Sequence, residues 1–326
     1  MDLKILPIIP NEIYFEILGH TAPSTGNLTE KQIQIFTRLS CVCRLFANFC
    51  LPRIFEHVEF SGCTSRDDSM PLKVYNGTIP YRTSRGSTLC SQISMKQPLA
   101  LALALKVKVC RFTHWKPDAP SSSSWAVPLF AKRYITGMIH MKHIRRLEFS
   151  DSYVDAEHWA AIATLKALEN LSFVLCRFLQ GPADDEPDNR IRLKVSCLQV
   201  TNCRGHRQPF AAVDVQHLRT LAMDLLALDD VRWLPQSALT EICIYSMRLL
   251  NSWYIDQVHD LLMRVPKSLE ALWLPLAIGN GSPRGMLRRI FGDPEKVPPL
   301  LSSLTLRVTA SITNFLDVSE IRSLHV

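Results

Sequence analysis

The residues best suited to metal binding or nucleophilic chemistry are ten cysteines and ten histidines in a chain of 326 residues. Cys41 and Cys43 have one residue between them, whereas paired zinc ligands usually have roughly two to four. Cys197, Cys203 and His206 come nearest to a ligand cluster, but a closed zinc site needs another ligand. The spacing therefore predicts no metal site, and the lack of closely paired cysteines predicts reduced thiols.

Motifs for cofactor binding and catalysis are also weak. Gly279, Gly281 and Gly285 are spaced almost like a dinucleotide-binding loop, but the last glycine stands one residue late and no matching βαβ unit follows. The acidic run 184–188 lacks the spacing of a calcium loop. No HExxH, GxSxG or Walker motif occurs. We therefore expect no cofactor and no enzymatic activity.

The composition is that of an ordinary globular protein, with 47% hydrophobic and 21% charged residues. The net charge of +7 is spread along the chain, unlike the clustered charge of a dedicated nucleic-acid binder. The most apolar run, 98–105, is far shorter than the about 20 residues of a membrane span, and no signal peptide is evident. The expected location is the cytoplasm, the nucleus or both.

The first sixty residues predict short amphipathic helices. Asn11 is a suitable N-cap for a first helix, and Thr29 with Gln32 forms a capping box that opens a second helix, which Pro52 would end. Residues 54–60 alternate like a strand. Because helices this short bury little apolar area, the segment should need a partner or a neighbouring domain.

The order of motifs in this segment resembles the F-box, most closely that of short fungal F-box proteins. The motifs, in residues 6–60, are Ile9-Pro10-x-Glu12-Ile13, Ile17-Leu18, Val42-Cys43-Arg44 and Leu51-Pro52-x-Ile54-Phe55-x-x-Val58. The resemblance implies a three-helix module that binds the Skp adaptor of a cullin-RING ubiquitin ligase. The adaptor-binding residues that it implies are Ile9, Pro10, Glu12, Ile13, Ile17, Leu39, Val42, Cys43, Arg44, Pro52 and Phe55.

Two features depart from the family pattern. Ile9 replaces the usual leucine before the proline, and the link between the first two helices, roughly 21–26, is long and polar. An ordinary helical cap on the following domain is the alternative interpretation of this segment.

The rest of the chain contains the frame L-x-x-L-x-L eight times, with an aliphatic residue, Met or Phe at the three positions. Five of the seven intervals between starts fall within the range of about 20–29 residues typical of leucine-rich repeats. Cys176 and Cys203 occupy the ninth position, where the repeat favours Asn or Cys. The frames start at Ile144, Leu168, Val195, Leu218, Leu239, Leu269, Leu301 and Ile321.

These patterns predict an α/β fold in which a small N-terminal helical F-box module precedes a curved leucine-rich-repeat solenoid. The expected boundaries are 1–60 for the F-box, 61–140 for an irregular linker with the first poor repeats, and 141–326 for the solenoid. The first segment has 5 basic and 6 acidic residues, so the remainder carries a net charge of +8.

The repeat frame also predicts which side chains face away from the core. That row contains Arg146, Glu148, Asn170, Gln199, Asp224, Tyr245, Trp273 and Arg307. Because Trp, Tyr and Arg dominate many interfaces, we expect a protein-substrate site formed by four of them. These four residues are Arg146, Tyr245, Trp273 and Arg307.

The expected function is therefore that of a substrate receptor in an SCF-type ubiquitin ligase, which promotes protein degradation without doing chemistry itself. One alternative is a non-catalytic leucine-rich-repeat interaction scaffold without a ligase role. Another is a nucleic-acid binder that uses basic residues of the second part of the chain, but aromatic stacking platforms beside them are not evident. These basic residues are Lys106, Lys108, Arg111, Arg284, Arg288 and Arg289.

Overall fold

A computed structural model describes most of the first three quarters of the chain and three later strands. The described residues are 10–21, 28–61, 85–113, 126–179, 192–205, 207–245, 268–276, 305–310 and 321–324, with a few single residues between 257 and 266. Ile9, His206, the acidic run 184–188, the three glycines at 279–285 and the arginines at 284–289 lie outside them.

Three helices begin the described chain: α1 (Asn11–Thr21), α2 (Glu30–Ser40) and α3 (Arg44–Ile54). The capping box at the start of α2 is confirmed, since Thr29 Oγ1 accepts from Gln32 N at 3.3 Å and Gln32 Oε1 accepts from Thr29 N at 2.9 Å. The prediction of one helix from Thr29 to Pro52 is wrong. The chain turns between α2 and α3, and Pro52 lies inside α3.

Ten strands form a single sheet in the order β1-β2-β3-β5-β7-β8-β9-β10-β11-β12. Every pairing is parallel except that of β11 with β12. The strands are β1 (His57–Ser61), β2 (Val109–Thr113), β3 (Arg146–Ser150), β5 (Asn170–Val174), β7 (Cys197–Thr201), β8 (Thr220–Met223), β9 (Glu241–Ile244), β10 (Ala271–Leu276), β11 (Thr305–Ala310) and β12 (Ile321–Leu324). A separate pair joins β4 (Tyr153–Val154) to β6 (Arg177–Phe178).

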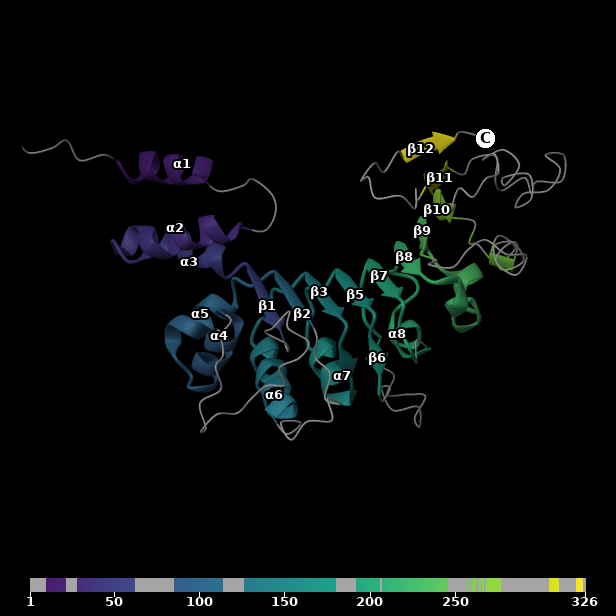
Figure 1. Ribbon diagram of the computed structural model, residues 1–326, viewed down its shortest axis with the longest axis horizontal. Coiled ribbons are helices and arrows are strands. Elements are labelled where there is room, and N and C mark those ends of the chain that lie inside the picture. The colour runs from purple at the N-terminus through teal and green to yellow at the C-terminus, as the bar shows by residue number, and fades with distance from the viewer. Residues whose placement is uncertain are drawn as a thin grey trace, which may run out of the picture.

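Helices of the connections lie together along one side of the sheet, and the α1–α3 module lies beside its first strand (Figure 1). They are α4 (Arg85–Ser94), α5 (Pro98–Ala104), α6 (Ala126–Ile139), α7 (Ala156–Ala163) and α8 (Arg207–Ala212). The connection from β8 to β9 instead contains two 3₁₀ helices, Leu225–Asp230 and Leu234–Gln236.

The predicted curved leucine-rich-repeat solenoid is wrong. The structure has a mostly parallel central sheet with helices, which is an α/β fold. A repeat array stacks equivalent units, each one supersecondary motif. Here the connections differ: two described helices separate β1 from β2, one long helix separates β2 from β3, and 3₁₀ turns precede β9. The last pairing, between β11 and β12, also reverses direction.

The core lies between the sheet and these helices, and alternate strand residues point into it. An aromatic column crosses the first four strands of the sheet: Phe60, Phe112, Phe149 and Phe173 follow one another with centroids 4.8, 4.9 and 5.4 Å apart. All four rings are almost fully buried. The column therefore joins β1, β2, β3 and β5 through side chains as well as through backbone hydrogen bonds.

Three successive strands end in the same type of turn. Asp151, Leu175 and Asn202 follow β3, β5 and β7 directly and have φ values of 48°, 57° and 53°. Asp and Asn tolerate this left-handed region, whereas leucine is disfavoured there. Asp151 N donates to Val174 O at 2.8 Å and Leu175 N donates to Thr201 O at 2.9 Å, so the turns extend the strand ladder.

Candidate functional site

The α1–α3 module has a small core of its own. Phe36 of α2 packs with Phe49, Cys50 and Ile54 of α3, and the rings of Phe36 and Phe49 meet edge to face at 6.4 Å. Helix α1 contacts α3 through Tyr14, whose ring lies 5.7 Å from the ring of Phe46. Among the described side chains of the module, these four form its buried core.

Among the described side chains of this module, four large apolar ones are exposed. Ile13 and Ile17 lie one turn apart on α1 and are 43% and 54% exposed, Ile35 of α2 is 44% exposed, and Val42 between α2 and α3 is 66% exposed. We call these four residues the apolar surface of the helical module. Ile13, Ile17 and Val42 belong to the set that the F-box resemblance implies, and sequence reasoning missed Ile35.

The other adaptor-binding residues implied by the resemblance fall into an exposed group and a partly buried group. Pro10, Glu12, Cys43 and Arg44 are exposed. Leu39, Pro52 and Phe55 are partly buried, and Leu39 and Phe55 pack against the core of the module. These two residues therefore contribute to folding, whatever they bind.

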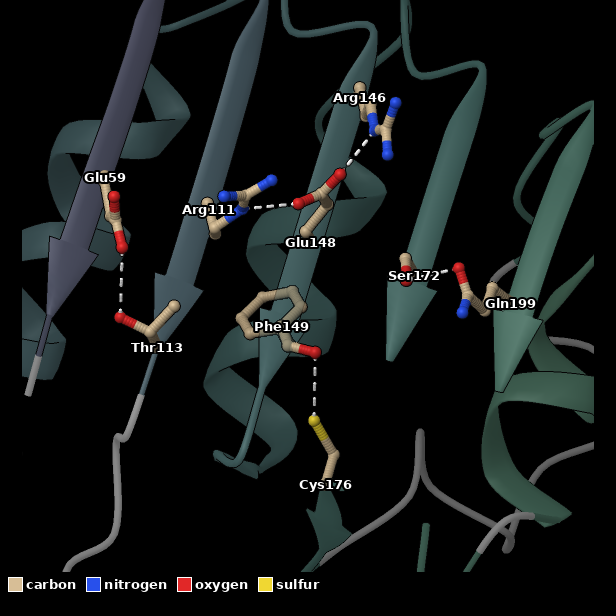
Figure 2. A network of polar contacts seen from close by, with 9 residues as sticks. All are labelled: Glu59, Arg111, Thr113, Arg146, Glu148, Phe149, Ser172, Cys176 and Gln199. Atoms are coloured by element: carbon tan, nitrogen blue, oxygen red, sulfur yellow. Dashed lines mark hydrogen bonds and ion pairs between the residues drawn. The ribbon is translucent and has the colours of Figure 1, made fainter. Parts of the chain in front are cut away.

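The second candidate site is the face of the sheet opposite the core. Its central feature is a polar network on β2 and β3 (Figure 2). Arg111 Nε donates to Glu148 Oε2 at 2.5 Å, and Arg146 Nε forms an ion pair with Glu148 Oε1. Further along the same face, Ser172 Oγ donates to Gln199 Oε1 at 3.1 Å (Figure 2). These partners hold the polar side chains in fixed positions.

The four residues predicted to bind substrate are not all brought together. Trp273 pairs in register with Arg307, and Tyr245 follows β9, the neighbour of β10. Arg146 lies on β3, four strand spacings from β9, which is about 19 Å at the usual interstrand distance. The structure thus groups Tyr245, Trp273 and Arg307 at one end of the sheet and places Arg146 elsewhere.

The two aromatic residues of that group differ in their surroundings. Tyr245 is exposed, and its backbone N–H continues the ladder by donating to Met223 O at 2.8 Å. Trp273 is partly buried, and its Nε1 donates to Glu241 Oε1 at 2.5 Å. Partial burial raises the pKa of the Tyr245 hydroxyl, so this side chain is a neutral hydrogen-bonding group at neutral pH. Sequence reasoning did not identify Glu241 as the partner of the tryptophan.

The thiols of Cys176 and Cys203, at the ninth position of their sequence frames, contact backbone carbonyl groups. Cys176 Sγ donates to Phe149 O at 3.3 Å (Figure 2), and Cys203 Sγ lies 3.4 Å from Phe173 O. A hydrogen bond with Cys176, together with burial, raises the pKa of the Cys203 thiol, so it stays protonated at neutral pH. In the described part of the chain, no three His, Cys, Asp or Glu side chains lie close enough to hold a metal ion.

The basic residues proposed for nucleic-acid binding are partly neutralised. Lys108 Nζ lies 2.8 Å from Glu56 Oε1, and Arg111 is bound to Glu148.

Among the described residues, no helix is long and apolar enough to cross a lipid bilayer.

No protein-family model matches this chain, and no curated protein shows significant similarity to it.

Proposed function

We propose that this protein is the substrate receptor of an SCF-type cullin-RING ubiquitin ligase. In this proposal, α1–α3 bind the Skp adaptor and the open face of the sheet captures a protein substrate. The protein would act by holding the substrate near the ubiquitin-charged enzyme, which is catalysis by proximity, and would work in the cytoplasm, the nucleus or both.

The observation that supports this proposal most is the apolar surface of the helical module. Exposed aliphatic side chains scattered singly are common on any protein, but Ile13, Ile17 and Val42 coincide with positions that the F-box motifs assign to the adaptor. Burying one such side chain in an interface contributes about 1.5–3 kcal/mol, so a few of them can dominate binding.

A non-catalytic interaction scaffold is the second candidate function, and one contact favours it. Leu51 and Phe55 of the α3 region pack against both the core of the helical module and the core beneath the sheet. This double contact is what a helical cap on the sheet requires. It is also compatible with adaptor binding, because Leu51 and Phe55 are partly buried whereas Ile13, Ile17 and Val42 face outward.

Binding of the full chain to purified Skp adaptor tests the proposal. We expect wild type to be retained by the immobilised adaptor, and the triple variant Pro10→Ala/Ile13→Asp/Val42→Asp to lose at least about tenfold in affinity, since it puts two charges into an apolar interface. The matched control is Met95→Asp/Leu99→Asp, which changes two similarly exposed apolar residues near and in α5.

The control variant should bind like wild type, and circular dichroism should show the same helix and strand content in all three proteins. Failure of well-folded wild type to bind would leave the scaffold as the better account. Equal loss of binding in the triple and control variants would also count against the module as the adaptor site.

A further inference from the structure

A cavity of about 550 Å³ lies between the helical module and the start of the sheet. Residues of α2 and the segment before it form one wall, α3 forms the second, and β1 with β2 forms the third. Its apolar lining comes from Leu28, Ile33, Ile54, Val58 and Val109. Cavities that bind small molecules usually measure about 300–1,000 Å³, and this cavity has that size. Half of its ten lining residues are apolar and half are polar or charged.

Two arginines line the cavity, and each is held by a neighbour. Arg53 Nη1 donates to Phe49 O at 3.2 Å, and its guanidinium carbon lies 3.6 Å from the centre of the Phe49 ring. Arg111 is fixed through Nε by Glu148. That bond uses one of five N–H donors of the guanidinium, so the group keeps donors for a ligand. Pre-positioned arginines lose little side-chain freedom on binding an anion.

His57 also lines the cavity. Its Nδ1 is buried, and no donor or acceptor of the described residues reaches it. Burial has the largest effect and lowers the pKa of His57. Glu56 raises this pKa, and the cations Lys108, Arg111 and Arg146 lower it, so the net shift is downward and the ring is neutral at neutral pH. Because a buried polar atom without a partner costs stability, a ligand that hydrogen bonds with Nδ1 would gain from that contact.

The charges around the cavity fit a singly charged anion. The lining holds Arg53, Arg111 and Glu59, and Arg111 also pairs with Glu148, which in turn pairs with Arg146. These three arginines and two glutamates carry a formal charge of +1, with His57 neutral. We propose that this cavity binds a small apolar monocarboxylate, with its carboxylate on Arg53 and Arg111 and its apolar body against Leu28, Ile33 and Val109. The inference does not rest on the proposed ligase function, because neither the adaptor nor a substrate takes part.

The test uses the full chain without any adaptor. The probe is 1-naphthoate, and 1-naphthamide is its neutral analogue of the same shape. Binding is measured by saturation-transfer NMR and isothermal titration calorimetry. We expect wild type to bind naphthoate at least about tenfold more tightly than the amide, because a bidentate arginine contact needs the carboxylate. Arg53→Gln should reduce naphthoate affinity by about tenfold and leave amide binding unchanged.

A pair of variants on α2 tests the location. Ile33→Trp places a large ring in the cavity and should abolish naphthoate binding. Ile35→Trp makes the same change at an exposed position of the same helix that does not line the cavity, and should bind like wild type. The proposal is overturned by a folded wild type that does not bind naphthoate, by equal affinity for acid and amide, or by folded Ile33→Trp and Arg53→Gln variants that both retain wild-type affinity.

Discussion

Arg111 on β2 and Glu148 on β3 share a 2.5 Å hydrogen bond from Nε to Oε2, across two strands that pair in parallel register. The other oxygen of the same carboxylate pairs with Arg146. The Glu148 side chain is only 12% exposed, whereas those of Arg111 and Arg146 are 41% and 58% exposed. One sheltered carboxylate thus organises two more exposed guanidinium groups.

Replacing this carboxylate should destabilise the sheet. We expect Glu148→Gln to lower the free energy of unfolding by about 1–3 kcal/mol, because hydrogen bonds to charged groups are lost in a sheltered site. Urea denaturation followed by circular dichroism measures the change. The matched control is Glu169→Gln, since Glu169 pairs with Arg145 at 3.8 Å and both side chains are more than half exposed. The control should change stability by less than about 0.5 kcal/mol. Equal effects of the two substitutions would contradict this assignment.

The turn after β5 offers a stabilising substitution. Leu175 is half exposed and has a φ of 57°, where a leucine costs about 1–2 kcal/mol relative to ordinary backbone. Leu175→Asn should raise the free energy of unfolding by about 0.5–1 kcal/mol, because asparagine tolerates this conformation, as Asn202 does after β7. Thermal and urea denaturation measure the gain. Leu179→Asn, at an exposed leucine without positive φ, is the control and should not stabilise; a gain there would show that polarity, not the turn, is responsible.

The start of α7 should be sensitive to acid. Asp155 Oδ1 accepts from His158 N at 3.1 Å and lies 2.7 Å from His158 Nδ1. The side-chain hydrogen bond with His158 lowers the pKa of Asp155 against the smaller opposing effect of burial. Since the folded pKa lies below the unfolded value of about 3.9, the contribution of Asp155 is complete above that pH and is lost as pH falls through the folded pKa.

The comparison variant is Asp155→Asn, which keeps a capping oxygen without a titrating charge. We expect wild type to exceed the variant in stability at about pH 6, and the difference to shrink on acidification to about pH 2.5. Urea midpoints of both proteins across this range provide the measurement. A difference that stays constant, or grows as pH falls, would show that the carboxylate is not stabilised by folding.

Strand positions were the most predictable part of this fold. Alternate residues of the strands point into the core, because alternate burial leaves a clear period of two in the sequence. Among the described side chains these pairs are Leu147 and Phe149, Leu171 and Phe173, Leu198 and Val200, Leu221 and Met223, and Ile242 and Ile244. The capping box of Thr29 and Gln32 was equally predictable, since a cap depends on residues within one turn of helix.

What the sequence pattern could not specify was how the strands are connected and which side chains meet. The regular spacing suggested equivalent repeats, yet the described connections differ, and β12 pairs in the opposite direction. The contact of Trp273 with Glu241 joins residues 32 positions apart, and the cavity near His57 joins two helices to two strands. Such sites arise from packing between elements, which no local period encodes.

The aromatic column couples the stabilities of the strands that contribute its rings. Each ring from Phe60 to Phe173 touches the next, and Val200 takes the following position in register. Shortening Phe112 and shortening Phe149 would create voids that share a wall, so their effects on stability cannot simply add. The ring-to-ring contacts along the register stop at Phe173, because the next positions hold Val200, Met223 and Ile244. We therefore expect coupling between ring truncations to be confined to β1, β2, β3 and β5.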